Sequence, residues 1–398
     1  MIVLENESLA LSFRENGTLT SFLHKKIGKN VIDSHADLFF MNLENDSCKE
    51  NLVWASEQKI TGNAIGSAAA DFRVERLKID NGRADAPVVD MTIVFHVRLD
   101  GEKVVFTADV YNRTDMRILD FQYPRIGVVK SIGDGKPSLL WPDQPGKIYH
   151  NIGDRLASMA PTREYGGNLM RTTYPGNAMM GLCALLDAKE SLFLSFRDPD
   201  FSVAQFVVRG DPDDAGAVTL IANKNLCLAR GRHTVATVEL LYYHGDWHRG
   251  ARDYANWMSS YRPVHPVPRW VREMTGYFLV INKQQYGYEM WDYDTLPKLY
   301  ELAQAHGFDT LGLFGWYQTG HDNNYPDLEV SNTMGGAEGL RKGIASIHER
   351  GGHVTLYYQG HLIDTGTDFY KNGGYKMEGK TRWGTPYWEE YSKYSESD

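Results

Sequence analysis

The hydrophobic pattern of this chain changes once, at residues 262–268, where three prolines fall within seven residues. Proline fixes φ and lacks a backbone N–H, so this segment is too rigid and too poor in donors for a regular helix or strand. Before it, large apolar residues recur at every second position, most clearly over residues 91–98, and this period is typical of β-strands. After it, short apolar runs alternate with helical patterns. We therefore expect two regions of different architecture, joined by a proline-rich linker.

The first region, up to about residue 243, has the pattern of β-strands joined by tight turns. Asn16-Gly17 is a strong hairpin signal between two apolar runs, because both residues tolerate positive φ. A helix with Asp246 as its N-cap is expected after the last strand. Short, regularly spaced strands without amphipathic helices among them predict an antiparallel β-sandwich, with strands at 9–13, 71–79, 88–99 and 104–111.

The second region alternates strand and helix patterns. Continuous apolar runs at 277–281, 310–314 and 353–358 predict buried strands, with helices expected from Thr295 and around Leu340. This order predicts a parallel sheet of βαβ units. The region falls well short of the ~250 residues of a complete (β/α)8 barrel, so we expect an incomplete parallel barrel. A small, complete three-layer domain is the alternative.

Several segments resemble a family of multidomain glycosidases. Residues 9–28, 174–176 and 191–198 are similar to the mutarotase-like β-sandwiches that precede glycoside hydrolase barrels, and residues 245–258 resemble the connecting helix of that architecture. The segment from Phe314-Gly-Trp316 to Gly351 looks like the second and third units of an α-galactosidase or α-glucosidase type barrel. The endo-α-N-acetylgalactosaminidase group has the same layout.

The resemblance implies a mutarotase-like β-sandwich over residues 1–244, a connecting helix and linker over 245–268, and the N-terminal part of a (β/α)8 barrel over 269–398. In the family, the nucleophile is an aspartate after the fourth barrel strand, and the acid/base aspartate follows a later strand. Only three strands are visible here, so the catalytic residues stay unassigned and we expect a C-terminally truncated, inactive relative. The family's Asp-Asp-Gly-Trp at the second strand is also altered, to Leu313-Phe-Gly-Trp316.

Aromatic and polar residues follow each predicted strand of the second region. In parallel barrels, the loops at the carboxyl ends of the strands contact the substrate. The segment from Gly315 to Gly336 is much longer than the 2–6 residues of an ordinary connection of this kind. Sugars are bound by aromatic rings that pack on C–H faces and by planar groups that bond pairs of hydroxyls. The predicted substrate-binding residues are Trp316, Asp322, Asp327, Tyr358, His361 and Asp364.

Each of these residues also has a structural interpretation. Trp316 would then pack against the sandwich. Asp322 and Asp327 would lie in a solvated turn, and His361 and Asp364 would form a satisfied pair at the end of a strand.

No metal or cofactor site is predicted. His244 and His248 have the i, i+4 spacing of zinc ligands but lack the glutamate of the metalloprotease pattern. A loop that starts at Asp322 is not an EF-hand, because it lacks the glycine at position 6 and the closing glutamate at position 12. No glycine-rich phosphate loop follows a predicted strand.

Charge and hydropathy limit the partners. The formal net charge of −9 leaves no excess of basic residues to neutralise the phosphates of a nucleic acid. No apolar stretch reaches the ~18 residues of a membrane span, so no membrane partner is expected. The first residues lack the features of a signal peptide, which predicts a cytoplasmic protein.

The functional prediction is a glycoside hydrolase-like protein that acts on or binds α-linked glycans, with a carbohydrate as its partner. The alternative is a non-catalytic carbohydrate-binding β-sandwich protein. A third interpretation is a lyase or isomerase whose acid and base residues lie on the sandwich, among His96, His150, Arg163 and Glu164.

Overall fold

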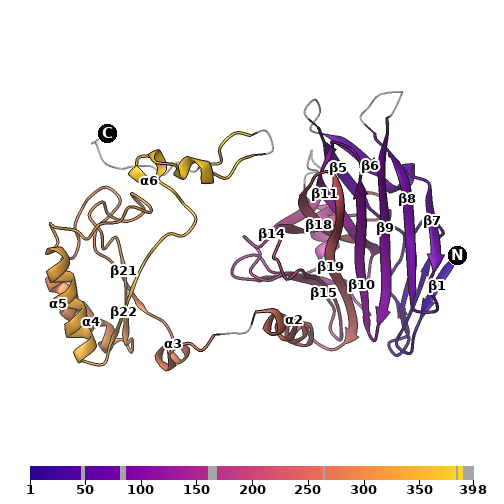
Figure 1. Cartoon of the computed structure of the whole chain (residues 1–398). Helices are drawn as coiled ribbons and strands as arrows, with labels where there is room; N and C mark the ends of the chain where they lie inside the picture. Colours follow the sequence, from indigo (N-terminus) through magenta and orange to yellow (C-terminus); the bar gives the residue numbers. More distant parts are fainter. Residues whose placement is uncertain (46–49, 81–86, 160–167, 263–264, 382–383, 389–398) are drawn as a thin grey trace. The chain divides into compact units, whose positions relative to one another are not determined.

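The computed structural model describes residues 1–45, 50–80, 87–159, 168–262, 265–381 and 384–388. The chain divides into two compact units, Met1–Val264 and His265–Asp398. The first unit is built of antiparallel sheets, and the second combines parallel strands with helices (Figure 1).

The first unit contains a nine-stranded antiparallel sheet, in which the predicted strands at 71–79, 88–99 and 104–111 are confirmed. Its central strands alternate buried and more exposed side chains, as the period of two requires. In spatial order the strands are β13 (Lys147–Tyr149), β12 (Ser138–Trp141), β15 (Leu182–Leu186), β16 (Glu190–Arg197), β19 (Gly231–His244), β10 (Lys103–Asn112), β9 (Val88–Asp100), β8 (Ala69–Lys78) and β7 (Ile60–Ala64).

The described residues of this unit also form two further antiparallel sheets. The predicted strand at 9–13 is confirmed, and Gly17 of the predicted turn has a φ of 80°. The six-stranded sheet has the order β14 (Leu169–Tyr174), β17 (Ala204–Gly210), β18 (Val218–Leu228), β11 (Arg117–Val129), β5 (Phe40–Glu44) and β6 (Asn51–Trp54). The four-stranded sheet has the order β1 (Ile2–Glu5), β2 (Leu9–Phe13), β3 (Leu19–His24) and β4 (Lys29–Asn30).

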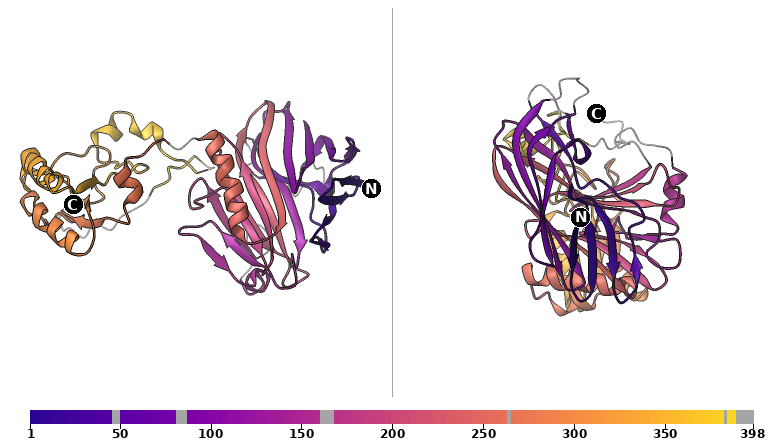
Figure 2. Two further views of the ribbon diagram at one scale, coloured as in Figure 1. Left: turned by 90° about the horizontal axis from the view of Figure 1, so that it is seen from below. Right: turned by 90° about the vertical axis from the view of Figure 1, so that its right-hand side faces the viewer.

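The nine-stranded and six-stranded sheets pack face to face (Figure 2). Phe95 of β9 stacks on Phe121 of β11 with ring centroids 5.9 Å apart, and Phe196 of β16 lies 4.4 Å from Phe206 of β17. The shared core between two antiparallel sheets confirms the predicted sandwich.

Two helices and a short 3-10 turn, η1 (Ala55–Glu57), accompany these sheets: α1 (Ile152–Ala157) and α2 (Trp247–Tyr261). The side chain of Asp246 accepts the backbone N–H of His248 at 3.0 Å, which confirms the predicted N-cap. Gly250 lies directly over the ring of Phe193, and a Cβ there would be only 2.7 Å from ring atoms. The buried Tyr254 donates a hydrogen bond from its hydroxyl to the hydroxyl of Tyr174. Helix α2 is therefore packed on the nine-stranded sheet.

A cluster of four charges also holds α2 to this sheet. Arg197 of β16 is 7 % exposed and lies 2.9 Å from Glu239 of β19 and 2.5 Å from Asp253 of α2. Lys103 of β10 reaches the same two carboxylates at 3.1 and 2.8 Å. Opposite charges alternate in this cluster, so each partly buried ion has a partner.

The second unit has a three-stranded parallel sheet in the order β20 (Phe278–Ile281), β21 (Thr310–Phe314) and β22 (His353–Leu356). The predicted parallel arrangement is confirmed. The third strand ends at Leu356, two residues before the predicted end. The Tyr357 N–H still bonds to the Leu313 carbonyl of β21, and the Tyr357 carbonyl accepts the indole N–H of Trp316. The other elements are α3 (Arg269–Glu273), η2 (Tyr293–Thr295), α4 (Leu296–Ala305), α5 (Gly336–Glu349), α6 (Asp368–Lys371) and η3 (Gly374–Met377).

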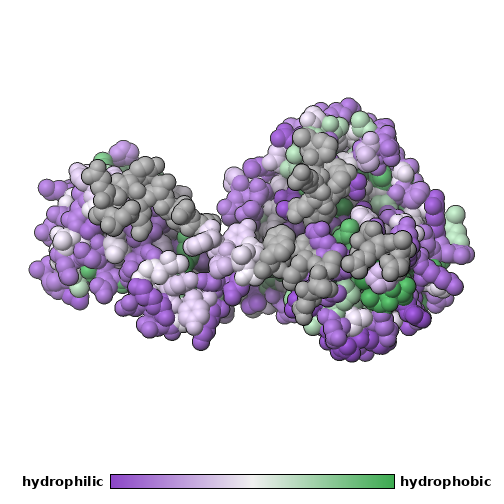
Figure 3. All heavy atoms as spheres, turned by 90° about the horizontal axis from the view of Figure 1, so that it is seen from above, coloured by the Kyte–Doolittle hydropathy of each residue, from purple (hydrophilic) through white to green (hydrophobic). Residues whose placement is uncertain are grey.

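Helices α4 and α5 pack together with the strands in one apolar core. Leu296 and Leu299 of α4 and Leu340 and Ile347 of α5 are buried in the same cluster as Leu313 of β21. Among the described residues, every helix is too short or too polar to span a lipid bilayer. The face of the molecule shown in Figure 3 is largely hydrophilic, with small scattered apolar patches.

Candidate functional site

The carboxyl ends of the parallel strands carry most of the predicted site residues. Because the three strands run in the same direction, the segments after Ile281, Phe314 and Leu356 meet at one edge of the sheet. We call this the carboxyl edge.

Asp322, one of the predicted carboxylates at this edge, is partly buried, with 19 % of its side chain exposed. The hydroxyl of Tyr317 accepts the Asp322 backbone N–H at 3.0 Å and donates to the Tyr325 hydroxyl at 2.8 Å. The Tyr325 hydroxyl in turn donates to Asp322 Oδ1 at 3.1 Å. Burial raises the pKa of both tyrosines, so both phenols stay protonated and donate at neutral pH. Asp322 is thus held in a closed ring of hydrogen bonds.

The second oxygen of Asp322 orients a histidine. Asp322 Oδ2 lies 3.0 Å from His321 Nδ1 and accepts from Gln285 at 3.2 Å. Among the described residues, no hydrogen bond involves His321 Nε2, and 22 % of this side chain is exposed. An Asp–His pair with a free Nε2 can donate a proton to, or accept one from, a bound hydroxyl.

Aromatic rings form a layer beside His321. The rings of Phe314 and Tyr357 stack with centroids 4.2 Å apart and an interplanar angle of 15°. His321 lies over the same layer, 5.7 Å from Tyr357 and 5.6 Å from Phe314. Burial raises the pKa of Tyr357, which therefore also stays protonated. Sequence reasoning missed Tyr357 and Phe314, although both stand at the end of a predicted strand.

Two glycines allow the loop after β21 to pass close to the loop after β20. Gly315 and Gly320 have positive φ values of 57° and 81°. A Cβ at Gly315 would lie 2.1 Å from the Lys283 carbonyl oxygen, and one at Gly320 would lie 2.3 Å from that of Gln284. Only glycine fits both requirements, so these positions bring His321 and Asp322 to the carboxyl edge.

Asp327 and Asp364 connect loop segments to one another. Asp327 Oδ2 accepts the backbone N–H of Phe369 at 2.9 Å. Asp364 accepts the backbone N–H groups of Asn324 at 2.9 Å and Gly366 at 2.8 Å. In this structure both carboxylates join the loop after β21 to the segment after β22.

The remaining predicted residues differ in their exposure. Trp316 is only 4 % exposed, and its indole N–H donates to the Tyr357 carbonyl at 3.1 Å. Its ring therefore supports the segment after β22 and presents little surface to a ligand. Tyr358 is 60 % exposed and contacts the edge of Trp316, with ring centroids 5.3 Å apart. His361 is exposed, and among the described residues its side chain makes no hydrogen bond or ion pair.

An ion pair after β20 was not predicted. Lys283, 8 % exposed, lies 3.1 Å from Glu289, which also accepts a hydrogen bond from Thr333. The Thr333 hydroxyl and the Lys283 ammonium lower the pKa of Glu289 against the effect of burial, so this carboxylate stays ionised. Thr333 lies on the loop after β21, and no spacing in the sequence relates it to Glu289.

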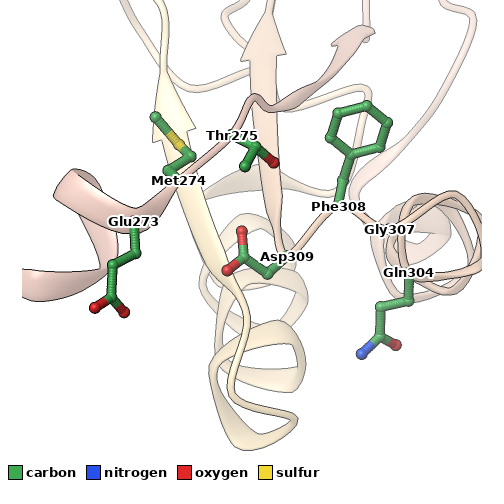
Figure 4. Close-up of a pocket in the computed structure, with 7 residues that line it drawn as sticks. All are labelled: Glu273, Met274, Thr275, Gln304, Gly307, Phe308 and Asp309. Atoms are coloured by element: carbon green, nitrogen blue, oxygen red, sulfur yellow. The ribbon is translucent and has the colours of Figure 1, made fainter.

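A hollow of about 270 Å³ lies at the opposite ends of the strands. Its lining includes Glu273, Thr275 and Asp309, which precede β20 or β21 (Figure 4). Because ligands of parallel sheets bind at the carboxyl ends, this hollow does not belong to the candidate site.

The residues of the lyase or isomerase interpretation are not brought together where they are described. His96 on β9 lies 2.7 Å from Asp71, whereas His150 bonds to Ser138 at 3.1 Å beside β12. Arg163 and Glu164 lie outside the described residues.

The two histidines with zinc-ligand spacing also have separate carboxylate partners. His244 lies 3.3 Å from Glu190 and His248 lies 3.2 Å from Asp246. Across the described ranges, no three His, Cys, Asp or Glu side chains are grouped as metal ligands would be.

Comparison with known proteins identifies one family match and several similar folds. Residues 235–398 match a family described as a domain of unknown function, DUF6259. This match covers the end of β19, helix α2 and the second unit. No curated protein matches the sequence.

Solved structures of an α-N-acetylgalactosaminidase, NagBb from Bifidobacterium bifidum, are similar in fold. The ligand-free enzyme has a TM-score of 0.66 and its complex with GalNAc a TM-score of 0.64, each at 14 % sequence identity. Both alignments cover 97 % of this chain and 63 % of the enzyme, so the chain spans less than two thirds of the length of this enzyme. A galactose mutarotase-like protein from Lactobacillus casei is 13 % identical over 61 % of this chain and 100 % of its own, with a TM-score of 0.39 that is too low to support an argument. The similarity to NagBb shows that this chain has a glycoside hydrolase-like fold.

Proposed function

We propose that the carboxyl edge binds a glycan, and that β20, β21 and β22 correspond to strands of a (β/α) barrel. The observation that carries this proposal is the His321–Asp322 pair, which lies over the layered rings of Phe314 and Tyr357 where parallel strands end. This arrangement offers a sugar both kinds of contact that it needs. Rings pack against C–H faces, and the imidazole and carboxylate bond hydroxyls.

The exposed residues of the edge complete the proposed site. Tyr358 presents a ring that is 60 % exposed, and the exposed His361 follows it on the same segment. Asp364 and Asp327 hold the loops at this edge through hydrogen bonds to the backbone. The Trp316 indole donates a hydrogen bond to the Tyr357 carbonyl and so holds the segment that carries Tyr358 and His361. The fold similarity makes α-linked N-acetylgalactosamine the first sugar to test.

We assign binding rather than bond cleavage to these carboxylates. A retaining glycosidase needs two carboxyl groups ≈ 5–5.5 Å apart, one free to attack the anomeric carbon and one that exchanges a proton. Asp322, Asp327 and Asp364 each accept hydrogen bonds from neighbouring segments of the protein. We therefore expect negligible hydrolysis of aryl α-N-acetylgalactosaminides by this 398-residue chain.

The proposal is tested by titrating the full chain with N-acetylgalactosamine, galactose and methyl α-glycosides, with binding followed by calorimetry or ligand-observed NMR. Tyr358→Ala should weaken binding at least about fivefold, because a stacked ring contributes about 1 kcal/mol beyond its buried area. The fold should persist, since Tyr358 is largely exposed. The matched control is Tyr261→Ala, which removes a ring of 53 % exposure at the end of α2.

Two outcomes would contradict the proposal. Sugar binding that is unchanged by both Tyr358→Ala and Asp322→Asn would place the ligand elsewhere. If binding were instead lost only on substitution of sandwich loops, the alternative of a carbohydrate-binding β-sandwich would be favoured.

A further inference from the structure

A charged hollow lies at one end of the β-sandwich, within the first unit. Its volume is about 360 Å³, which is in the lower part of the range of small-molecule pockets. Five separate elements meet there: the end of β3, the turn between β9 and β10, the start of β16, the end of β19 and the first turn of α2. All the residues that line it lie among the described residues.

The deepest polar group of the hollow is a histidine with an unused donor. His24, the last residue of β3, is 2 % exposed, and its Nδ1 accepts the backbone N–H of Ile27 at 3.4 Å. This bond assigns the ring hydrogen to Nε2. Among the described residues, His24 Nε2 has no hydrogen-bond partner, because Glu102 Oε1, although 3.4 Å away, is poorly aligned. A buried donor without a partner is costly, and a bound hydroxyl would satisfy it.

The charges around this donor alternate in sign. Glu102 lies between His24 and Arg249, with which it forms a short ion pair. Glu190 and His244 face each other across the β16–β19 ladder, 3.3 Å apart. Burial raises the pKa of Glu102, but the ion pair with Arg249 opposes this effect and the net pKa is below the usual value, so Glu102 stays an ionised acceptor. Lys26 adds an exposed ammonium group.

This balance of charges selects among ligand classes. An anion would face the carboxylates of Glu102 and Glu190, and a cation would face Arg249 and Lys26. Ile27 is the only aliphatic residue that lines the hollow, so an apolar ligand would have little apolar surface to contact. A neutral polyhydroxylated molecule can use the donors and the acceptors together, because each hydroxyl both donates and accepts.

We propose that this hollow is a second carbohydrate-binding site, separate from the carboxyl edge, and that it takes a neutral mono- or disaccharide. The hydroxyls of the sugar bridge His24 Nε2 to Glu102 and Glu190. The guanidinium of Arg249 keeps Glu102 in place. The site lies wholly within the first unit, so it does not depend on the function proposed for the second unit.

The test uses free galactose, N-acetylgalactosamine and glucose as probes, with the full chain observed by ligand-detected NMR and calorimetry. In a Tyr358→Ala background, where binding at the carboxyl edge is weakened, the binding that remains should be sensitive to substitutions in the hollow. The single variant Glu190→Gln, which replaces one of the proposed acceptors, should weaken this binding at least tenfold, and the double variant Lys26→Met/His244→Leu, which changes two polar groups of the lining, should also weaken it. Lys26 and His244 are exposed, but His244 also pairs with Glu190, so the melting temperature of each variant is measured to separate loss of binding from loss of stability. Lys59→Met, at an exposed position that does not line the hollow, is the matched control.

Three results would overturn the proposal. The hollow would be a solvent-filled surface feature if no sugar bound in the Tyr358→Ala background. Inorganic phosphate binding more tightly than any sugar, and lost in Lys26→Met/His244→Leu, would identify an anion site instead. Sugar binding that is retained in both pocket variants would place the ligand outside the hollow. If sugar binding failed at the carboxyl edge but persisted here, the function proposed for the second unit would be wrong and this inference would stand.

Discussion

Replacing Lys224 by methionine should stabilise the protein at neutral pH. Lys224 of β18 is fully buried in the sandwich, and among the described residues its ammonium has no hydrogen-bond partner. Its Nζ lies 4.5 Å from the centroid of the Phe196 ring. The nearby Asp198 is already satisfied by the backbone N–H groups of Asp200 and Ser202. Methionine has a similar length and carries no charge to bury.

The magnitude follows from the pKa of this amine. Burial lowers the pKa of Lys224 from 10.5 to about 8, and Asp198 opposes this shift only in part. A shift of this size corresponds to about 3 kcal/mol, since one pKa unit is ≈ 1.36 kcal/mol. The cation–π contact with Phe196 returns about 0.5–2 kcal/mol to the charged form. The expected gain in the free energy of unfolding for Lys224→Met at pH 7 is therefore about 1–3 kcal/mol.

The gain should depend on pH with a defined sign. Below pH 8 the amine is protonated in both states, and the folded state bears the full cost of the buried charge. Between about pH 8 and 10.5 the unfolded chain binds more protons than the folded one, so the wild-type free energy of unfolding rises with pH. The advantage of Lys224→Met over the wild type should therefore shrink across this window.

Urea unfolding of the full chain at pH 7 and pH 9.5 measures the gain in the free energy of unfolding for Lys224→Met and its decrease with pH. Lys59→Met, at an exposed position, should change the free energy of unfolding by less than about 0.5 kcal/mol at either pH. The reasoning would be refuted if Lys224→Met destabilised the protein equally at both pH values. That result would mean that the ammonium is stabilised by a partner rather than left without one.

Three further substitutions test the packing. Gly250→Ala should lower the free energy of unfolding by about 1–2 kcal/mol in urea denaturation. A Cβ at this position would lie 2.7 Å from the Phe193 ring, and this clash outweighs the ~1 kcal/mol gain in helix propensity. A more stable variant would contradict the packing of α2. Tyr325→Phe should lower the free energy of unfolding of the second unit by about 1–3 kcal/mol, because the buried Tyr317 hydroxyl then lacks its acceptor. An unchanged melting temperature would show that the ring of hydrogen bonds around Asp322 is not formed. Gly315→Ala should abolish sugar binding at the carboxyl edge in calorimetry, because a Cβ there would lie 2.1 Å from the Lys283 carbonyl oxygen. The control Gly307→Ala also changes a glycine of positive φ, but nothing lies within 4 Å of its Cβ, so this variant should still bind sugar. Equal sugar binding by the two variants would refute the close contact between the loops.

The sequence predicts the two architectures well because each depends on local periodicity. Strand β10 alternates strictly between buried and more exposed side chains, β8 and β9 alternate over most of their length, and the three strands are neighbours in the sheet. The irregular strand β11 was not predicted, since its pairing with β18 contains several register shifts that break the period of two. A regular pattern predicts regular pairing, and bulges remove that signal.

The candidate site was predicted only at the level of segments. Parallel strands place their carboxyl ends together, which is why the loops after residues 281, 314 and 356 could be grouped from sequence. The roles of single residues depend on contacts that spacing does not encode. Asp364 bonds to the backbone of Asn324, and Thr333 reaches Glu289, across about 40 residues of chain. A packed Trp316 was one of the two interpretations from the sequence, but its bond to the Tyr357 carbonyl, 41 residues away, is not encoded in any spacing.

The four-charge cluster beneath α2 has a practical consequence for dissecting this protein. Cutting the chain after His244 would remove Asp253, leave Arg197 and Lys103 to share Glu239 alone, and uncover the ring of Phe193. Such a fragment should precipitate or be digested rapidly by proteases. A fragment that ends within the proline-rich stretch keeps the helix as a lid over these groups, and we expect it to be the shortest version of the sandwich that can be purified intact.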